Sequence, residues 1–308
     1  FAYNNALNAI GSKFPTLTNF VFKNKLTATI LKNSFAIAEK RTLPLVSNKS
    51  LSKHIKLYKN KEIIKNYIKT IYFFNDEFTN YLDTSIGQDA IELLMGLNYH
   101  VKFVSHSESG RSFLSKGLLE QAKQVANENV TVFKNLITSE TPLIGIEPSA
   151  ILTFTDEYPR LADDKEAAKV IAENTFLIEE FIQQEIESGN IKASQFTKEA
   201  KTIKFHGHCH QKALRNQLSS FKVLNLPENY TVTIIPSGCC GMAGSFGYEK
   251  EHYDVSMQIG EQTLFPAIRR APATTVISAN GTSCRHQIMD GTEKEALHPI
   301  TILRRALI

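Results

Sequence analysis

All four cysteines of this chain lie in its last third, as Cys209, the adjacent pair Cys239 and Cys240, and Cys284. Thiolates are soft ligands, and four of them suit either a tetrahedral zinc ion or an iron–sulfur cluster. Their spacing differs from the paired CxxC knuckles of zinc ribbons and from the cysteine run of ferredoxins. The sequence therefore predicts a metal or cluster site whose ligands come from three separate segments.

Alternating strand-like and helix-like segments indicate how these three segments meet. From about residue 69, short apolar runs alternate with runs whose apolar residues recur at helical spacing. Parallel sheets with crossover helices require this order. We expect strands at 71–74, 101–104, 143–146, 202–206, 231–236 and 274–279, and helices at 86–97, 118–136, 163–188, 211–220 and 250–270, with Gly189 ending the helix at 163–188.

The cysteines follow the ends of three of these expected strands. In open α/β sheets the loops at the carboxyl ends of the strands form the ligand sites. We therefore expect Cys209, Cys239, Cys240 and Cys284 to converge on one point.

The chain also contains an internal repeat. An alignment without a gap from Tyr99 to Gly110 places Glu108 and Ser109 over the cysteine pair, and a separate segment places Ala150 over Cys284. We interpret the chain as two related units, of which only the second carries thiols. The aligned segments are Ile71–Glu77 with Ile203–Cys209, Tyr99–Gly110 with Tyr230–Gly241, and Glu147–Ala150 with Gly281–Cys284.

The expected fold class is α/β, with two pseudo-repeated units of parallel sheets and crossover helices, preceded by a basic, mainly helical N-terminal arm. With 308 residues, 42% of them hydrophobic, the chain can bury the cores of about two domains. The expected divisions are the arm or linker at 1–68, a cysteine-free unit at 69–162, a connecting helix at 163–200, and the thiol-bearing unit at 201–308.

Charge is distributed unevenly along the chain. Residues 1–70 hold 13 Lys and Arg against two acidic residues, whereas the remainder holds 22 basic and 29 acidic residues. Such a basic arm favours an electrostatic contact with another domain of the same polypeptide or with an anionic surface, and a solvated basic linker is the alternative. We expect short helices in the arm, because Pro15 and Pro44 interrupt it.

The composition indicates in which cellular compartment the protein is expected. No apolar run approaches the roughly 20 residues that cross a bilayer. The few cysteines suit a reducing compartment, so we expect a cytoplasmic protein, with peripheral contact at the inner face of the membrane through the arm as an option. The first residue is Phe1, which we interpret as a sign that the chain is part of a longer polypeptide. Nucleic acid is not an expected partner, because stacking motifs on a recognisable fold are missing.

The thiol-bearing segments resemble the cysteine-rich CCG domain. The resemblance rests on Ser237–Tyr248, with its Cys-Cys-Gly core, together with His206–Lys212 and Ser283–Ile288. That domain occurs in heterodisulfide reductase B-type subunits, in iron–sulfur subunits of glycolate and anaerobic glycerol-3-phosphate oxidation, and at the C-terminal end of large FAD and iron–sulfur D-2-hydroxyacid dehydrogenases. The last group is the most similar, because the first unit also matches it, through Phe74–Tyr81, Ser109–Leu119, Gly145–Ser149 and Asp156–Pro159.

The resemblance implies an iron–sulfur electron-transfer region of an FAD-dependent dehydrogenase for D-lactate, glycolate or a similar 2-hydroxy acid. FAD and ferredoxin-like modules would precede this chain and act as its partners, with an unknown electron acceptor, and no catalytic residues are expected here. Cys209, Cys239, Cys240 and Cys284 would bind a cluster of the 4Fe-4S type. The chain departs from the family where Arg285, His286 and Gln287 follow the last cysteine in place of a CxxC motif.

Alternatives stay open at this point. The four thiols suit a structural zinc ion or a metal-free interaction module, and a disulfide between adjacent cysteines would be strained. Alternation along an extended chain places His206, His208 and His210 on one face, opposite Cys209, which favours hydrogen-bonding roles over ligation. In the first unit, Glu77, Glu108 and Arg111 suit either a vestigial anion pocket or an internal salt bridge in place of a metal.

Overall fold

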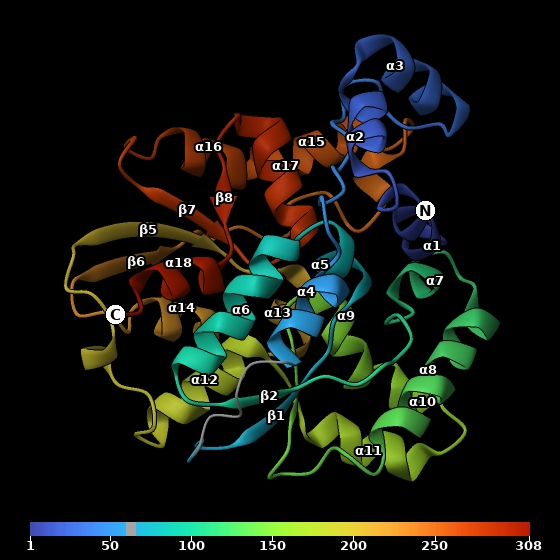
Figure 1. Ribbon diagram of the computed structural model, residues 1–308. Helices are drawn as coiled ribbons and strands as arrows, with labels where there is room; N and C mark the ends of the chain where they lie inside the picture. Colours follow the sequence, from blue (N-terminus) through green and yellow to red (C-terminus); the bar gives the residue numbers. More distant parts are fainter. Residues whose placement is uncertain (60–65) are drawn as a thin grey trace.

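The computed structural model describes residues 1–59 and 66–308 (Figure 1). Within these residues the strands form two four-stranded sheets in which every pairing is parallel. This arrangement confirms the predicted α/β class. The first sheet contains β1 (Thr70–Phe73), β2 (His100–Lys102), β3 (Leu143–Gly145) and β4 (Thr175–Leu177), and the second contains β5 (Lys201–His206), β6 (Tyr230–Ile234), β7 (Val276–Ala279) and β8 (Ala296–Leu297).

Strand order and register confirm the internal repeat. The first sheet runs β2-β1-β3-β4 and the second β6-β5-β7-β8, which is the same order in each unit. Ile71 pairs with Val101, as Ile203 pairs with Val232. The same equivalence holds across the next strand, in the pairings Tyr72 with Leu143 and Lys204 with Ile277. The aligned sequence segments therefore give the correct structural equivalences.

Helices surround both sheets (Figure 1). Those of the first unit are α5 (Glu77–Tyr81), α6 (Thr84–Gly96), α7 (Arg111–Ser115), α8 (Leu119–Phe133), α9 (Pro148–Ile151), α10 (Tyr158–Leu161), α11 (Lys165–Glu173) and α12 (Ile178–Glu187). Those of the second are α13 (Cys209–Leu214), α14 (Leu218–Leu224), α15 (Tyr253–Gln262), α16 (Leu264–Arg269), α17 (Thr282–Thr292) and α18 (Pro299–Ala306). Short 3-10 turns occur at η1 (Leu152–Phe154), η2 (Ala193–Gln195) and η3 (Phe246–Tyr248).

The prediction of one helix over 163–188 is wrong. Strand β4 interrupts it between α11 and α12 and pairs with β3. Thr175 and Phe176 suit a buried strand, and the Glu180 carboxylate accepts the Leu177 N–H at 2.9 Å, which starts α12 anew. Gly189 follows α12 with a φ of +76°, consistent with its predicted role as a helix stop.

Two other predicted helices are also divided. The segment at 211–220, expected as one helix, is divided between α13 and α14. The segment at 250–270 is likewise divided between α15 and α16. In the second case Pro266 lies in the first turn of α16, where its missing N–H is tolerated, whereas a continuous helix would place it in the interior. Strand β8 has only two residues and was not predicted.

The two units share one hydrophobic core. Residues of β1 and α6 pack in the same buried cluster as residues of β5, α14 and α18. Polar contacts reinforce the packing of α18 on α6, because Thr301 Oγ1 donates to Asp89 Oδ2 at 2.6 Å and Arg304 pairs with Glu92 at 2.9 Å. The loops that follow the strands of the two sheets are therefore held in a fixed mutual arrangement.

The N-terminal arm is mainly helical, as expected. Its helices are α1 (Asn4–Gly11), α2 (Pro15–Lys23), α3 (Lys25–Ser34) and α4 (Leu51–Lys59). Helices α2 and α3 project from the body of the molecule, whereas α4 lies on it (Figure 1). The charge of the basic run from Lys53 to Lys61 predicts that it stays outside a core, yet its Ile55 is buried in the shared core beside Leu51 of the same helix. Residues 60 and 61 of that run lie outside the described residues. Among the described residues, no helix combines the length and apolar character that a membrane span needs.

The buried carboxyl group of Glu179 in α12 makes stability depend on pH. Burial raises the pKa of Glu179 to about 8, whereas a Glu in an unfolded chain titrates near about 4.3. Between these values the folded state binds the extra proton, so stability falls as pH rises, by about 1.4 kcal/mol per pH unit for this one group. We expect Glu179→Gln to flatten this decline, measured by urea unfolding at pH 5.5 and 7.5. An unchanged pH dependence would refute this, and the exposed Glu166→Gln serves as control.

Candidate metal centre

The second unit delivers its four thiols from three neighbouring strands. Cys209 is the first residue of α13, after β5; Cys239 and Cys240 lie in the loop after β6; and Cys284 lies in the first turn of α17, after β7. Strands β6, β5 and β7 are adjacent and parallel, so their carboxyl ends meet at one edge of the sheet. The structure thus brings the four predicted ligands together, and their binding of a metal stays a prediction.

The thiols form a continuous chain of contacts. Cys239 is hydrogen-bonded to both Cys209 and Cys240, and Cys240 is hydrogen-bonded to Cys284. Cys240 and Cys284 are buried, with exposed fractions of 3% and 1%, whereas Cys209 and Cys239 are partly exposed. The chain therefore runs from an accessible end at Cys209 to a buried end at Cys284.

These contacts divide the thiols into two pairs by acidity. The hydrogen bond with Cys209, followed by that with Cys240, lowers the pKa of Cys239, and the hydrogen bond with Cys240 lowers the pKa of Cys284. The same bonds raise the pKa of their partners Cys209 and Cys240. The thiolate is the form that binds metals, so binding at this site would release the protons that these bonds hold between the sulfurs.

Backbone and side-chain donors surround the sulfur atoms. The N–H groups of Gly241 and Met242 donate to the sulfurs of Cys239 and Cys240 at 3.3 and 3.5 Å. Lys212 Nζ donates to Ser237 O at 2.7 Å, close enough to the four cysteines for charge interactions with each. Gly241 has a φ of +97°, and a Cβ there would lie 2.2 Å from Ser256 O, so this turn requires glycine. These donors favour negatively charged sulfur.

In the first unit a hydrogen-bonded pair occupies the equivalent position. Glu77, the first residue of α5, stands where Cys209 stands in the repeat, and Ser109 stands at the place of Cys240. The N–H and hydroxyl of Ser109 donate to the two carboxylate oxygens of Glu77 at 2.9 and 2.7 Å. Arg111 pairs with Glu157 and also donates to Ser149 O. Direct hydrogen bonds and one ion pair therefore connect these loops.

The prediction that three histidines share one face opposite Cys209 is wrong. The extended chain ends at His208, which caps α13 by accepting the His210 N–H at 3.1 Å, so the alternation does not continue. One nitrogen each of His208 and His210 lies with the Cys209 sulfur in a group within 4.8 Å, whereas His206 groups with Cys240 and Cys284. The histidines thus lie at opposite ends of the thiol chain.

Contacts across the two units hold the site, and sequence reasoning missed them. The Glu147 carboxylate accepts the Thr282 N–H at 2.8 Å and lies 3.9 Å from His208 Nε2. Burial opposes its ionisation, but the charge of His208 and the Thr282 hydrogen bond lower the pKa of Glu147. Arg285, beside Cys284, pairs at 2.5 Å with Asp83, the residue before α6. The first unit thereby fixes the loop that carries Cys284.

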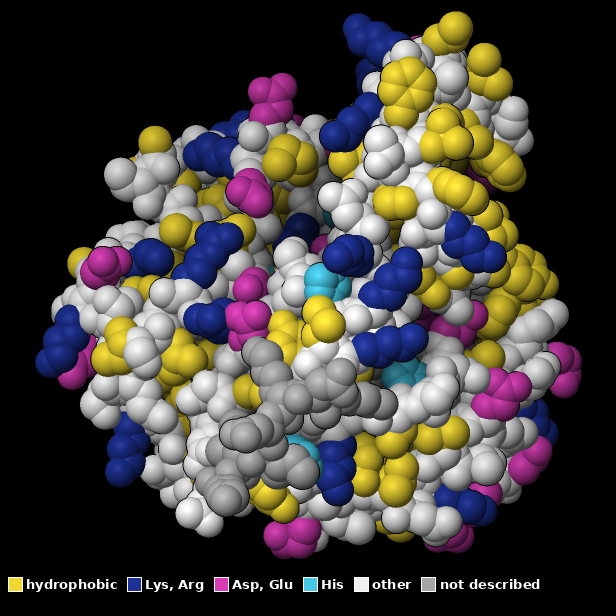
Figure 2. Space-filling model, in the orientation of Figure 1, with side chains coloured by type: hydrophobic (Ala, Val, Ile, Leu, Met, Phe, Trp, Pro, Cys, Tyr) yellow, Lys and Arg dark blue, Asp and Glu magenta, His cyan; other side chains and the backbone are white. Residues whose placement is uncertain are grey.

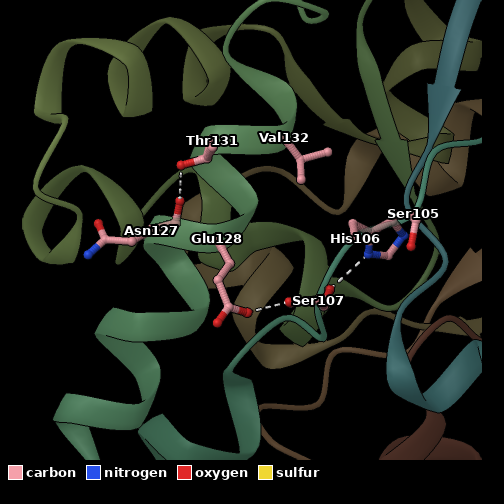
Figure 3. A pocket seen from close by; sticks show the side chains of 7 residues that line it. All are labelled: Ser105, His106, Ser107, Asn127, Glu128, Thr131 and Val132. Atoms are coloured by element: carbon pink, nitrogen blue, oxygen red, sulfur yellow. Dashed lines mark hydrogen bonds between the residues drawn. The ribbon is translucent and has the colours of Figure 1, made fainter.

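A surface pocket of about 520 Å³ lies elsewhere, in the first unit (Figure 3). Its lining residues are Ser105, His106, Ser107, Asn127, Glu128, Thr131 and Val132. Figure 3 shows Ser107 bonded to Glu128 and the His106 ring bonded to the Ser107 carbonyl group. The pocket contains none of the predicted ligands.

Comparisons with known proteins point to dehydrogenases. No protein-family model matches the chain. The chain is 24% identical over 308 residues to one of the subunits of the anaerobic glycerol-3-phosphate dehydrogenase of Escherichia coli K12, covering 99% of this chain and 76% of that subunit. It is 24% identical over 302 residues to the D-2-hydroxyglutarate dehydrogenase of the same organism, covering 95% of this chain and 28% of that enzyme.

A third relative is the D-2-hydroxyglutarate dehydrogenase of Haemophilus influenzae. It is 22% identical to this chain over 305 residues, and the match covers 29% of that enzyme. The chain is similar to parts of dehydrogenases along nearly its whole length. These relatives agree with the resemblance to glycerol-3-phosphate and D-2-hydroxyacid dehydrogenases, whereas the link to heterodisulfide reductase stays a prediction.

Proposed function

We propose that this chain is the iron–sulfur electron-transfer region of an FAD-linked dehydrogenase, with Cys209, Cys239, Cys240 and Cys284 as ligands of a cluster of the 4Fe-4S type. The observation that carries this proposal is the convergence of four thiols from three adjacent strands onto one chain of contacts. The dehydrogenase relatives support a redox role over a purely structural one.

The residues present fit such a group. Four soft donors lie in contact, two of them are buried, and backbone N–H groups and Lys212 compensate negative charge on sulfur. When bound, a cluster would supply reversible one-electron storage. The protein's part is to hold the thiolates, to shield the buried end from water and to set the surrounding charge.

The names of the relatives support a proposal for the substrate class. Glycerol 3-phosphate and D-2-hydroxyglutarate are both oxidised at a secondary alcohol, and the second of them is a 2-hydroxy acid. We propose a 2-hydroxy acid such as D-lactate, glycolate or a similar compound as substrate of the whole enzyme. FAD and ferredoxin-like modules, in the same polypeptide or complex, would oxidise it, and this chain would pass the electrons to an acceptor. A reducing, cytoplasmic setting would keep the thiols free.

Electron delivery tests the proposal in the complete dehydrogenase. We expect Cys239→Ser to leave the rate of flavin reduction by the 2-hydroxy acid within about twofold, and to lower reduction of the acceptor at least about tenfold, because a hard hydroxyl replaces a thiolate ligand. Stopped-flow absorbance at the flavin band separates the two steps. Ser245→Ala, on the same loop, is the control. Undiminished reduction of the acceptor in Cys239→Ser would refute an electron-transfer role for the site.

The arm suggests where this region meets the rest of the enzyme. Helices α1, α2 and α3 of the arm expose apolar side chains on the molecular surface (Figure 2). From residue 1 to residue 35, those more than half exposed are Tyr3, Leu7, Ile10, Phe14, Leu17, Phe20, Leu26, Ile30 and Phe35. We propose that this surface and its lysines bind an apolar, acidic face of the upstream modules. A photo-cross-linking side chain at Phe20 should capture those modules, and one at Val170 of α11 should not; capture of lipid alone would instead indicate membrane contact.

A further inference from the structure

His206 lies at the buried end of the thiol chain. It is the last residue of β5 and is fully buried. One of its ring nitrogens lies within 4.8 Å of the sulfurs of both Cys240 and Cys284, which lie within the same distance of each other. Three donors of two residue types thus face one another in a water-excluded position.

The hydrogen bonds of the ring leave Nε2 available. Nδ1 lies 2.7 Å from Ser237 Oγ, whereas the buried Nε2 has no nitrogen or oxygen partner among the described residues, and the ring interacts with the Cys284 thiol. With its proton on Nδ1 the ring donates to Ser237 Oγ, whose own proton is directed to Ile235 O at 3.5 Å. Nε2 then carries a free lone pair. Histidine ligands of metals commonly donate their other N–H to a fixed oxygen in this way.

A buried nitrogen without a partner costs free energy. In His206 a ligand would remove this cost, because one ring nitrogen lies within 4.8 Å of the Cys240 and Cys284 sulfurs, which would bind the same ligand. We infer that His206 Nε2 is itself a ligand of the metal group proposed at the thiols, and that Ser237 orients the ring. This inference rests on the proposed function and adds a nitrogen donor to it.

Two consequences follow for the site. Five donors then surround a group that needs four ligands. The thiol least required is that of Cys209, which is partly exposed and lies with His208 and His210. A neutral imidazole in place of a thiolate also reduces the negative charge on the group, which raises the reduction potential of an iron–sulfur centre.

Pulsed EPR of the reconstituted chain tests the inference. The chain is loaded anaerobically with iron and sulfide and is then reduced. If no cluster assembles, it is loaded with Co²⁺ alone. In either case the coupling of the metal's electron spin to nitrogen nuclei is measured. We expect a coupling that changes on ¹⁵N-histidine labelling and disappears in His206→Cys, which retains metal. His206→Ala should lose metal at least about fivefold, and Ser237→Ala should shift the coupling. Circular dichroism verifies that each variant is folded.

His298→Gln is the matched control, because His298 is equally buried and its Nε2 also has no hydrogen-bond partner among the described residues. This variant should leave the coupling unchanged. A wild-type chain that binds metal without histidine coupling, or a coupling that persists in His206→Cys, overturns the inference while leaving the thiol site intact. A wild-type chain that binds neither iron nor Co²⁺ overturns the proposed function and this inference together.

Discussion

Cys240→Ser and Cys284→Ser are each expected to remove at least about nine-tenths of the bound metal, whereas Cys209→Ser should retain more than half. The two buried thiols lie within 4.8 Å of each other and of a His206 nitrogen, and a serine oxygen there is a poor ligand for soft metals. Cys209 lies at the accessible end, where a replacement can be compensated by water or by the neighbouring histidines. Metal per folded chain, measured after anaerobic reconstitution, distinguishes the three variants.

Ser109→Ala is the control for this series, because Ser109 occupies the place of Cys240 in the first unit and is also fully buried. It should leave the metal content unchanged. Equal losses in all three cysteine variants would contradict a gradient from the buried to the exposed end. Full retention in Cys240→Ser would contradict the site itself.

Arg41→Ala is expected to lower the free energy of unfolding by about 3–5 kcal/mol, because it leaves a buried ion-pair partner uncompensated. The guanidinium group of Arg41 is fully buried, pairs with Asp290 at 3.2 Å, and donates to Gly247 O at 2.6 Å and Ser256 Oγ at 2.8 Å. It also lies over the Tyr253 ring, 4.8 Å from its centroid. Urea unfolding at pH 7 measures the loss.

Exposed Arg160→Ala is the matched control, because its ion pair with Asp156 is a surface i,i+4 contact of about 0.5 kcal/mol or less. A loss below about 1 kcal/mol in Arg41→Ala would show that the arm is only loosely attached. The expected loss also affects the site, because Gln287 Nε2 connects Ser256 O with Cys240 O through bonds of 3.0 and 2.9 Å. Arg41 is therefore connected to the cysteine loop through Ser256 and Gln287.

The repeat could be predicted from sequence because it preserves strand register. Residues that pair across β1 and β2 have counterparts that pair across β5 and β6, and apolar runs mark all four strands. The convergence of the cysteines followed from the rule that strand ends of a parallel sheet share one edge. Strand β4 was missed because its three residues lie within a run of apolar residues at helical spacing, and β8 has only two residues.

Contacts between distant segments could not be predicted. Arg41 lies in a basic arm that suggests solvated charge, and its partner Asp290 is 249 residues away. Likewise Glu147 and Thr282 meet only because the two units pack together. The placement of His210 was misjudged because alternation assumes an extended chain, whereas α13 begins at Cys209.

Iron, zinc and acid-labile sulfide in the chain purified without oxygen, together with its visible absorption spectrum, test the central claim most directly. The proposed function predicts iron and sulfide near about four per chain, as in a 4Fe-4S cluster, with broad visible absorption that Cys240→Ser abolishes. One zinc ion per chain, or no metal after anaerobic reconstitution with iron and sulfide, would contradict an electron-carrying site.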